Sequence, residues 1–482
     1  APDKGGLGAD HDVNALNVIA GPNGYEPMYD RTPYVLQPNC GYGATATALA
    51  LNLAGAPIIS NLNGAISLED NFGQIHVLVG QDRNIHSLNT AGAWIQESFT
   101  PLPAASAGAA NNLSWNFIRF NNKIIANRFG LYALVSSDLS SMGAHSFAQM
   151  SPSGPDAKYG VRVADFVVFA WTKESGVFNP FRVRWSAYNN PQDYVQSVAT
   201  MSDFQDLVAD YGPIRGLVGG PFGLIFQESA IVRMTQAPAP IIFRFDVIAT
   251  GSGCFTQTNK SIVAHNGLIY YWGNDDVYVT DGSSAPRGLG AGRIYREILS
   301  QSIRTNSSLA LNVGPEDESI LGITGAGCAN KNIVVWAYSN AAADTVTTFL
   351  NINRLLIYNV VTGKFTVSDM NGGSASLLFN GHVQLPGQIT TSGTYVAAVY
   401  YRDICGFNAT ASGANLFSFG NYLSRNTMPA TIETGELSGR NGKRIEIMNV
   451  RPLVENNYGS GTAVMTAQIG TRNNLNVGAA IA

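Results

Sequence analysis

The sequence predicts an all-β protein, a β-propeller of six to eight blades with additional N- and C-terminal strand segments that form an antiparallel accessory sheet. Three observations support this fold class. Glycine makes up 51 of 482 residues, about 11% against a usual value of roughly 7%, which indicates a chain rich in turns. Hydrophobic residues make up 45% of the chain, which excludes a disordered protein. A strand-turn-strand unit also recurs along most of the sequence.

The repeated unit consists of a β-branched or aromatic run, a polar or glycine turn, and a second such run. Its copies begin near residues 73, 115, 163, 214 and 261, so that successive starts are 42, 48, 51 and 47 residues apart. A sixth copy includes Ile333 to Tyr338 and Leu355 to Asn359, and a weaker seventh includes Tyr395 to Tyr401 and Leu416 to Phe419. A spacing of roughly 40 to 50 residues is typical of blades of four short strands that stack around an axis.

These repeats predict three parts of the chain. Residues 1–60 form an N-terminal extended or strand segment, residues 61–429 form the propeller, and residues 430–482 form a C-terminal β segment. Near residues 286–308 the pattern predicts a loop followed by a short helix, because Ile294, Ile298 and Leu299 fall on one helical face. This insertion separates the fifth blade from the sixth.

Both terminal segments contain strand patterns. Thr32 to Leu68 carries no charged side chain, but its Asn, Gly and Pro residues interrupt it too often for a membrane-spanning helix, which needs about 20 apolar residues. Within it, Ala44 to Leu53 alternates with period two and predicts a strand that serves either as an assembly surface or as part of the protomer core. Arg444 to Val450 and Ala463 to Ile469 predict antiparallel strands outside the ring.

Charge and cysteine content argue against three classes of protein. The net charge is −4, and the clustered Lys and Arg residues of a protein that grips nucleic acid by neutralising phosphates are missing. Four cysteines, Cys40, Cys254, Cys328 and Cys405, are far apart and show no C-x-x-C spacing. They predict four separate buried thiols and exclude both a zinc site of that type and a dense disulfide framework.

Candidate reactive groups have simpler structural interpretations. Asp10 to Asp12 could ligate a metal, but no partner cluster accompanies this Asp-His-Asp run, and a solvated arm is favoured. Asp275 and Asp276 follow Asn274 between two strand runs, where a hairpin turn is favoured over an acid-base pair. Gly288 to Gly292 has neither a βαβ context nor phosphate-loop spacing. We therefore predict no enzyme activity and no catalytic, cofactor-binding or metal-binding residues.

The six tryptophans give a further prediction about packing. They fall about one per blade, a distribution that favours core packing over a set of sugar-stacking side chains. They are Trp94, Trp115, Trp171, Trp185, Trp272 and Trp336.

Two parts of the sequence resemble a known family. Arg182 to Tyr194 contains the unit R-x-R-W-S-x-x-x-N-P-x-D, which is followed by the runs Ile214 to Gly220 and Leu224 to Met234. Together these segments resemble the central part of the tail-hub or nozzle proteins of short-tailed bacteriophages, also described as packaged-DNA stabilisation proteins. The similarity covers roughly residues 180–300 and resumes over 430–475, at Ile432 to Glu436 and Arg451 to Val454. The chain ends soon after Gly470, where the family has further strand material.

The resemblance implies a structural virion protein of the phage tail, made in the cytoplasm of the bacterial host. It implies a homohexameric ring with a head-to-tail adaptor above it and a tail plug, needle or spike below it. Double-stranded DNA passes through the lumen without specific contacts, and the ring retains the packaged genome until ejection. It implies no cofactor and no membrane span. The alternative function is a carbohydrate-binding or glycan-active β-propeller, which would need carboxylates and aromatic residues at one mouth of the ring.

Four residues in the resembling segment are expected to have structural roles. Arg182, Arg184, Trp185 and Asp193 are predicted to stabilise a blade through a salt bridge or a turn. This expectation concerns the fold and assigns no active site.

Overall fold

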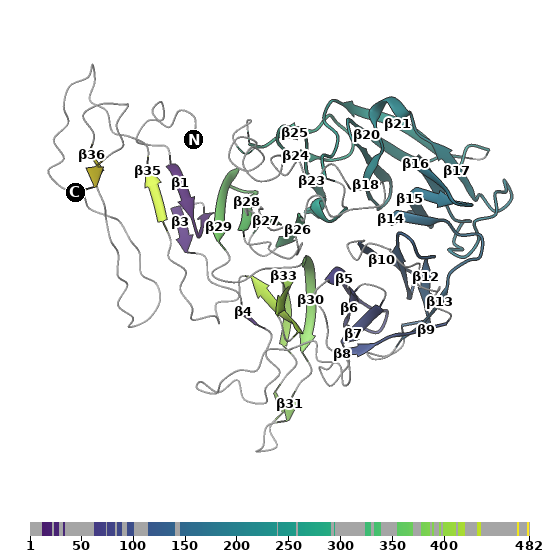
Figure 1. Ribbon diagram of the computed structural model, residues 1–482, viewed down its shortest axis with the longest axis horizontal. Coiled ribbons are helices and arrows are strands. Elements are labelled where there is room, and N and C mark those ends of the chain that lie inside the picture. Colours follow the sequence, from purple (N-terminus) through teal and green to yellow (C-terminus); the bar gives the residue numbers. More distant parts are fainter. Residues whose placement is uncertain are drawn as a thin grey trace. The chain divides into compact units, whose positions relative to one another are not determined.

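The computed structural model consists almost entirely of β-strands (Figure 1). The chain divides into two compact units, one formed by Ala1–Ala15 with Thr431–Ala482 and the other by Leu16–Ala430. The structure describes residues 12–21, 24–27, 32–33, 62–73, 75–81, 84–88, 94–100, 114–139, 145–238, 240–256, 259–290, 294, 323–328, 332–338, 354–369, 377–385, 388–389, 395–396, 399–410, 413–419, 431–434, 470–471 and 480–481.

The larger unit contains the predicted β-propeller, and six blades follow one another along the sequence. Blade 1 consists of β5 (Leu62–Glu69), β6 (Ile75–Gln81), β7 (Asn84–Leu88) and β8 (Trp94–Gln96). Blade 2 consists of β10 (Trp115–Phe120), β11 (Lys123–Arg128), β12 (Leu134–Ser136) and β13 (Ser146–Gln149), with β9 (Ser98–Thr100) added at its edge. Blade 3 consists of β14 (Asp156–Val163), β15 (Phe166–Glu174), β16 (Val177–Trp185) and β17 (Asp203–Asp206).

The next three blades repeat this pattern. Blade 4 consists of β18 (Ile214–Val218), β19 (Gly223–Gln227), β20 (Ala230–Gln236) and β21 (Phe243–Thr250). Blade 5 consists of β22 (Val263–His265), β23 (Leu268–Trp272), β24 (Val277–Thr280) and β25 (Arg287–Gly288). Blade 6 consists of β26 (Thr324–Cys328), β27 (Ile333–Tyr338), β28 (Arg354–Asn359) and β29 (Lys364–Asp369). Within every blade the successive strands pair antiparallel.

A seventh sheet lies between blades 1 and 6. It consists of β30 (Leu377–Leu385), β33 (Val399–Thr410), β34 (Gly413–Phe419) and β4 (Thr32–Pro33), and a separate two-stranded hairpin joins β31 (Gln388–Ile389) to β32 (Tyr395–Val396). Its strand β30 lies against both β5 and β26 (Figure 1). Because β4 comes from the N-terminal part of the chain and its partner β34 from the C-terminal part, this sheet joins the two ends of the larger unit.

The N-terminal segment belongs partly to the propeller unit. β2 (Val18–Gly21) pairs with β3 (Gly24–Pro27), and the Asn359 side-chain amide donates a 2.7 Å hydrogen bond to the Ala20 carbonyl oxygen. Ile19 packs against the core of blade 6. The larger unit therefore begins at Leu16, whereas the sequence analysis placed the whole of residues 1–60 in a separate segment.

The smaller unit contains short strands. β1 (Asp12–Leu16) is a neighbour of β35 (Thr431–Thr434), and β36 (Gly470–Thr471) pairs antiparallel with β37 (Ala480–Ile481). The predicted strands Arg444 to Val450, Ala463 to Ile469 and Ala44 to Leu53 lie outside the described residues.

The predicted insertion after blade 5 begins later than expected. Arg287 and Gly288 form β25 because the free edge of β24, at Tyr278 and Val279, pairs with them and completes the blade. Ile294 is helical and buried, as its apolar pattern predicted. The remainder of the predicted helix to Ser308 lies outside the described residues.

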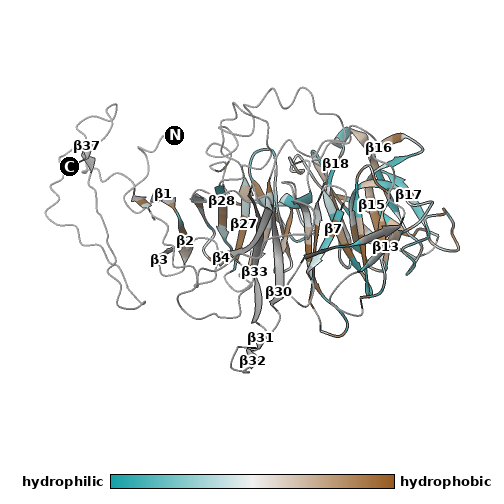
Figure 2. Cartoon of the chain, turned by 60° about the horizontal axis from the view of Figure 1, so that its bottom comes forward, coloured by the Kyte–Doolittle hydropathy of each residue, from teal (hydrophilic) through white to brown (hydrophobic). Residues whose placement is uncertain are grey.

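Apolar side chains fill the contact between neighbouring blades, which we call a seam. Many residues of the blade strands are hydrophobic (Figure 2). In the seam between blades 3 and 4, the Phe243 ring packs edge-to-face on Phe166 at 5.0 Å and on Trp185 at 5.2 Å. The five tryptophans whose burial is described, all except Trp94, are core residues, as predicted. The prediction of about one tryptophan per blade is wrong for two blades. Blade 3 contains two tryptophans, and blade 4 contains none; Phe226 and Phe243 are the large aromatic residues of its core.

Glycine residues allow the innermost strands to approach each other around the axis. A Cβ atom on Gly64 of β5 would collide with the backbone of Trp115 in β10. A Cβ on Gly219, directly after β18, would collide with the Arg162 carbonyl oxygen in β14, and a Cβ on Gly325 of β26 would lie 2.5 Å from Val263 of β22. Backbone atoms therefore pack directly against the next blade at several points of the ring.

The substitution Gly219→Ala tests this close approach. The added methyl group has to displace the backbone of blade 3, so we expect the free energy of unfolding to fall by about 1–3 kcal/mol. Urea unfolding would measure the change. Gly154→Ala is the control, because a Cβ there meets only ordinary contacts of 3.4 Å or more and should change stability by less than about 0.5 kcal/mol. An equal effect of both substitutions would contradict the packing argument.

Candidate functional site

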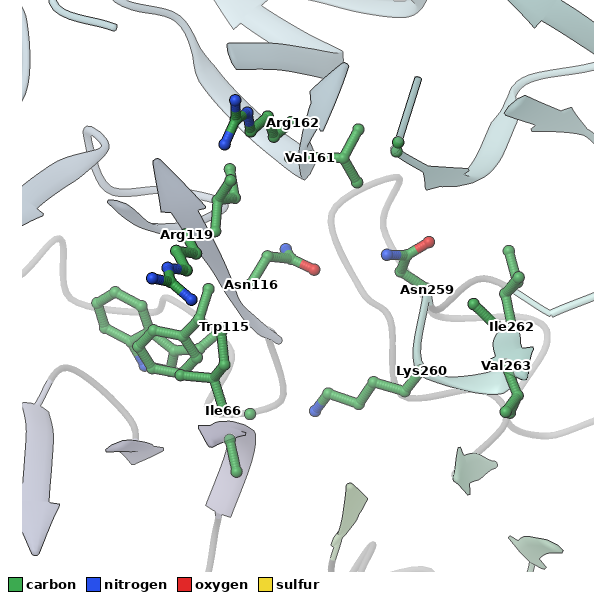
Figure 3. Close-up of a pocket in the computed structure, with 18 of the residues that line it drawn as sticks. Ile66, Trp115, Asn116, Arg119, Val161, Arg162, Asn259, Lys260, Ile262 and Val263 are labelled. Atoms are coloured by element: carbon green, nitrogen blue, oxygen red, sulfur yellow. The ribbon is translucent and has the colours of Figure 1, made fainter. Parts of the chain in front are cut away.

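A cavity of about 880 Å³ lies along the propeller axis (Figure 3). Residues of β5, β10, β14, β22 and β26 and the turn after β18 line it, so all six blades contribute to its wall. Glycine and aliphatic residues form much of this wall, including Gly64, Gly160, Val161, Gly219 and Ile262. The fold builds this concave feature from residues that lie far apart in the sequence.

Three polar side chains point toward the middle of the cavity (Figure 3). The Asn116 side-chain nitrogen donates a 2.6 Å hydrogen bond to the Lys158 carbonyl oxygen, which turns the Asn116 amide oxygen toward the cavity. The Asn259 side-chain oxygen accepts a 2.9 Å bond from the Leu217 backbone, which leaves the Asn259 NH₂ group facing the cavity. Lys260 extends into the cavity from the side opposite Arg119. This set can hydrogen-bond to a small polar molecule.

The two arginines of the cavity wall turn away from the axis (Figure 3). Arg119 donates to the Asn71 side chain at 3.2 Å and thereby joins blade 2 to blade 1. Arg162 donates to the Ala164 carbonyl oxygen at 2.7 Å and to the Asp165 carboxylate at 3.1 Å. Both arginines stand just before the turn that ends an innermost strand, a position that the sequence analysis did not single out. These bonds give both arginines structural roles at the edge of the cavity.

The four residues expected to stabilise a blade do so in blade 3. Arg182 donates two bonds to Asp206, at 2.7 and 2.8 Å, and Arg184 donates to Glu174 at 2.5 Å. The Trp185 indole donates to the Met201 carbonyl oxygen at 2.9 Å. The predicted salt bridges are therefore confirmed.

Asp193 provides the predicted turn. Its carboxylate accepts a 2.9 Å bond from the Val195 backbone, and its carbonyl oxygen accepts a 2.7 Å bond from Ala187. Arg184 also donates to the Tyr194 carbonyl oxygen at 2.7 Å. The turn after β16 is thus tied to the edge of blade 3.

A buried polar cluster at the seam between blades 1 and 2 escaped the sequence analysis. Asp70, at the end of β5, lies 3.1 Å from His76 Nε2, and His76 Nδ1 lies 3.3 Å from Nε2 of His145, directly before β13. The Glu97 carboxylate, between β8 and β9, accepts bonds from the Ser87 hydroxyl and the His145 backbone. The two histidines are 69 residues apart, so no short sequence motif joins them.

Burial changes the proton affinity of this cluster. Desolvation raises the pKa of Glu97 to about 7, against the opposing effect of its two hydrogen bonds. Desolvation, together with the charge of His76, lowers the pKa of His145 to about 4. On the opposite face of blade 1, His86 of β7, whose two ring nitrogens have no hydrogen-bond partner, also has its pKa lowered to about 4 by desolvation.

The other candidates from the sequence do not assemble into a reactive site. Asp275 and Asp276 lie in the β23–β24 hairpin, as predicted, where Asp275 accepts a 2.7 Å bond from Tyr278 and Asp276 accepts two 3.0 Å bonds from Gly290. Asp10 and His11 lie outside the described residues. Among the residues that are described, no group of His, Cys, Asp or Glu is arranged to hold a metal ion.

The structure describes the side chains of two of the four cysteines. Cys254 and Cys328 are buried free thiols, as predicted, whereas Cys40 lies outside the described residues and the side chain of Cys405 is not described.

No helix in the described ranges is both long and apolar enough to cross a membrane.

Comparison with known proteins supports the fold class alone. No family model and no curated protein matches the sequence. Solved structures with similar folds include virginiamycin B lyase from Staphylococcus aureus, at 10% identity with a TM-score of 0.41, covering 75% of this chain and 98% of the lyase. A catalytically inactive form of that lyase with quinupristin gives 11% identity and a TM-score of 0.38, covering 77% and 98% of the two chains. The Pan2 WD40 domain of Neurospora crassa gives 6% identity and a TM-score of 0.37, covering 75% and 91%.

Arg182→Ala tests the ion pairs of blade 3. Loss of the paired bonds to Asp206 should lower the free energy of unfolding by about 1.5–3 kcal/mol, the range for hydrogen bonds to charged groups, because the Arg182 side chain is only 18% exposed. Arg244→Ala is the control, since the Arg244 side chain is 71% exposed in its pair with Asp246 and should contribute less than about 1 kcal/mol. Chemical denaturation of both variants would measure the difference, and equal losses would contradict the assignment.

Proposed function

We propose that this chain is a structural virion protein, the tail hub or nozzle of a short-tailed bacteriophage. In this function several copies form a homohexameric ring below the portal and adaptor. The ring extends the DNA channel, retains the packaged genome and seats a plug, needle or spike. The role is mechanical, and the propeller serves as a rigid block within each protomer.

The observation that carries the proposal is a set of exposed apolar side chains on blade 3, in and directly before the segment that resembles the nozzle proteins. We call this set the blade 3 patch. Its members are Val177, Phe178, Val195, Val198 and Val208, with exposed fractions from 37% to 70%. Val177 and Phe178 begin β16, Val195 and Val198 lie in the loop after that strand, and Val208 follows β17. Several exposed apolar side chains on one blade are consistent with a surface that associates with another protein.

The ion pairs of blade 3 give this surface a fixed framework. Val177 and Phe178 lie on β16, the strand that carries Arg182 and Arg184, while Val195 and Val198 lie on the loop that Asp193 orders. Val208 directly follows Leu207, whose backbone donates a 2.9 Å bond to the Phe181 carbonyl oxygen. A preorganised surface loses less conformational entropy when a second copy binds, which suits a permanent subunit contact.

The charge of the chain is consistent with a channel protein that does not bind DNA through many phosphate contacts. Only 13% of residues are charged, and the net charge is −4. Ring walls of this kind offer few cations to phosphate groups, so DNA would slide past without the salt-dependent grip of a basic surface. The axial cavity of a single propeller is not the proposed DNA channel, which would be formed between protomers by the ring as a whole.

The native mass of the purified chain tests the proposal. We expect a hexamer, or a monomer that becomes a hexamer when the phage adaptor ring is added, measured by native mass spectrometry or light scattering. The double substitution Val195→Asp with Val198→Asp should weaken assembly at least about tenfold, because two charges would have to be buried in the contact.

Val361→Asp is the matched control. Val361 is 65% exposed, close to the 70% of Val198, but it lies on blade 6 outside the blade 3 patch, so its substitution should leave the hexamer intact. A chain that remains monomeric at all concentrations and with the adaptor would contradict the proposal. That result would favour the alternative of a carbohydrate-binding or glycan-active propeller.

A further inference from the structure

We propose that the axial cavity binds a small organic anion that carries both a carboxylate and hydroxyl groups, the chemistry of a sugar acid. The cavity and its ligand are independent of the proposed tail function. Two features of the cavity support this assignment, namely the charge of its wall and the directions in which Asn116, Asn259 and Lys260 point.

The cavity wall is positively charged, although the chain as a whole is acidic. Among the described residues that line the cavity, three carry cationic side chains, Arg119, Arg162 and Lys260, and one carries a carboxylate, Asp165. Three positive groups and one negative group give this lining a formal charge of +2, whereas the whole chain has a net charge of −4. A cavity lined by an excess of one sign of charge concentrates molecules of the opposite sign. The wall therefore favours an anion over a neutral ligand.

The two arginines contribute charge without filling the middle of the cavity. Besides its bond to blade 1, Arg119 donates to the Asn121 carbonyl oxygen at 3.3 Å. The Arg162 guanidinium lies over the Phe120 ring, 5.4 Å from the ring centre. Because both side chains are held against the protein, they act on a ligand through their charge. The middle of the cavity is left to Lys260, which extends into it (Figure 3).

Asn259 and Lys260 supply hydrogen-bond donors for the anionic group. The Asn259 NH₂ group faces the cavity because the side-chain oxygen of this residue accepts the 2.9 Å bond from the Leu217 backbone. Lys260 is the next residue, and its ammonium group forms charge-assisted hydrogen bonds with anionic oxygens. One ammonium group and one amide match a singly charged carboxylate, whereas a phosphate has more charge and more oxygens than this pair can bind.

Asn116 supplies an acceptor on the other side of the cavity. Its side-chain nitrogen donates the 2.6 Å bond to the Lys158 carbonyl oxygen, so its own oxygen faces Asn259 across the cavity (Figure 3). An ionised carboxylate has no proton to donate, and this oxygen therefore needs a hydroxyl group elsewhere on the same ligand.

The remaining wall suits the carbon skeleton of such a ligand. Ile66, Val161 and Ile262 present apolar side chains between the polar groups. The volume of about 880 Å³ lies within the range of small-molecule sites, roughly 300–1,000 Å³. A hydroxylated carboxylate satisfies the donors, the acceptor and the apolar wall together.

Three ligands with carbon chains of equal length separate the two chemical requirements. Gluconate carries the carboxylate and the hydroxyl groups, sorbitol carries only hydroxyl groups, and hexanoate carries only the carboxylate. We expect gluconate to bind the full chain, and the other two ligands to bind at least about tenfold more weakly, as measured by isothermal titration calorimetry. Absence of gluconate binding in the millimolar range would overturn the proposal, as would equally tight binding of sorbitol or hexanoate.

Substitutions assign the binding to the cavity. Lys260→Gln removes the charge but keeps a donor, and should weaken gluconate binding at least about tenfold. Asn116→Leu removes the acceptor and should weaken it by about three- to tenfold. Lys123→Gln is the matched control, because the Lys123 side chain is 43% exposed, pairs with Asp138 at 3.6 Å and is not among the residues that line the cavity.

The control variant should bind gluconate as tightly as the unsubstituted chain. Unchanged binding in Lys260→Gln would sink the proposal. If that variant does not fold, the comparison of gluconate with sorbitol on the unsubstituted chain decides the matter.

Discussion

The close approach of the innermost strands around the axis is the constraint on which the rest of this structure depends. At Gly64, Gly216, Gly219 and Gly325, a Cβ atom would collide with the neighbouring innermost strand or with the segment that leads into it. Glycine lacks the side chain that would hold these strands apart, and its use costs conformational entropy on folding. These positions leave no room for side chains between neighbouring innermost strands, so side-chain packing has to stabilise the ring further out, in the seams.

The seams are stabilised by different kinds of side-chain contact. Between blades 3 and 4 the packing is aromatic, and between blades 5 and 6 Trp272 and Trp336 pack at 6.3 Å. Polar bonds tie the hairpins at one mouth of the ring, as between Asn266 and Asn332 at 3.2 Å and between Asn121 and Asn189 at 3.3 Å. These amides carry no charge, so they join blades without the desolvation cost of ions.

Sequence patterns predicted the strands of the fold better than they predicted which residues of different blades contact each other. Period-two runs separated by Asn and Gly turns were sufficient to identify the blades, because strand and turn preferences act over a few residues. The contacts at the seams join residues far apart in the chain, such as His76 with His145 or Trp336 with Ser261, and no local pattern encodes them. Arg287 and Gly288 were predicted to lie in a loop, because their own sequence has no strand pattern. They form a strand only by pairing with the free edge of β24. The Arg182 and Asp193 contacts were predictable because charged residues in a strand next to an Asn-Pro turn need nearby partners.

The seams differ in the buried ionisable groups that they contain. The cluster of buried residues shared by blades 3 and 4 consists of apolar side chains, whose packing does not change with pH. The seam between blades 1 and 2 combines an apolar cluster with Asp70, His76, Glu97 and His145, so part of its stability depends on proton concentration. Residues of β5 and β10, the innermost strands of these two blades, also line the axial cavity, so the two blades that share the ionisable cluster form one side of the cavity wall.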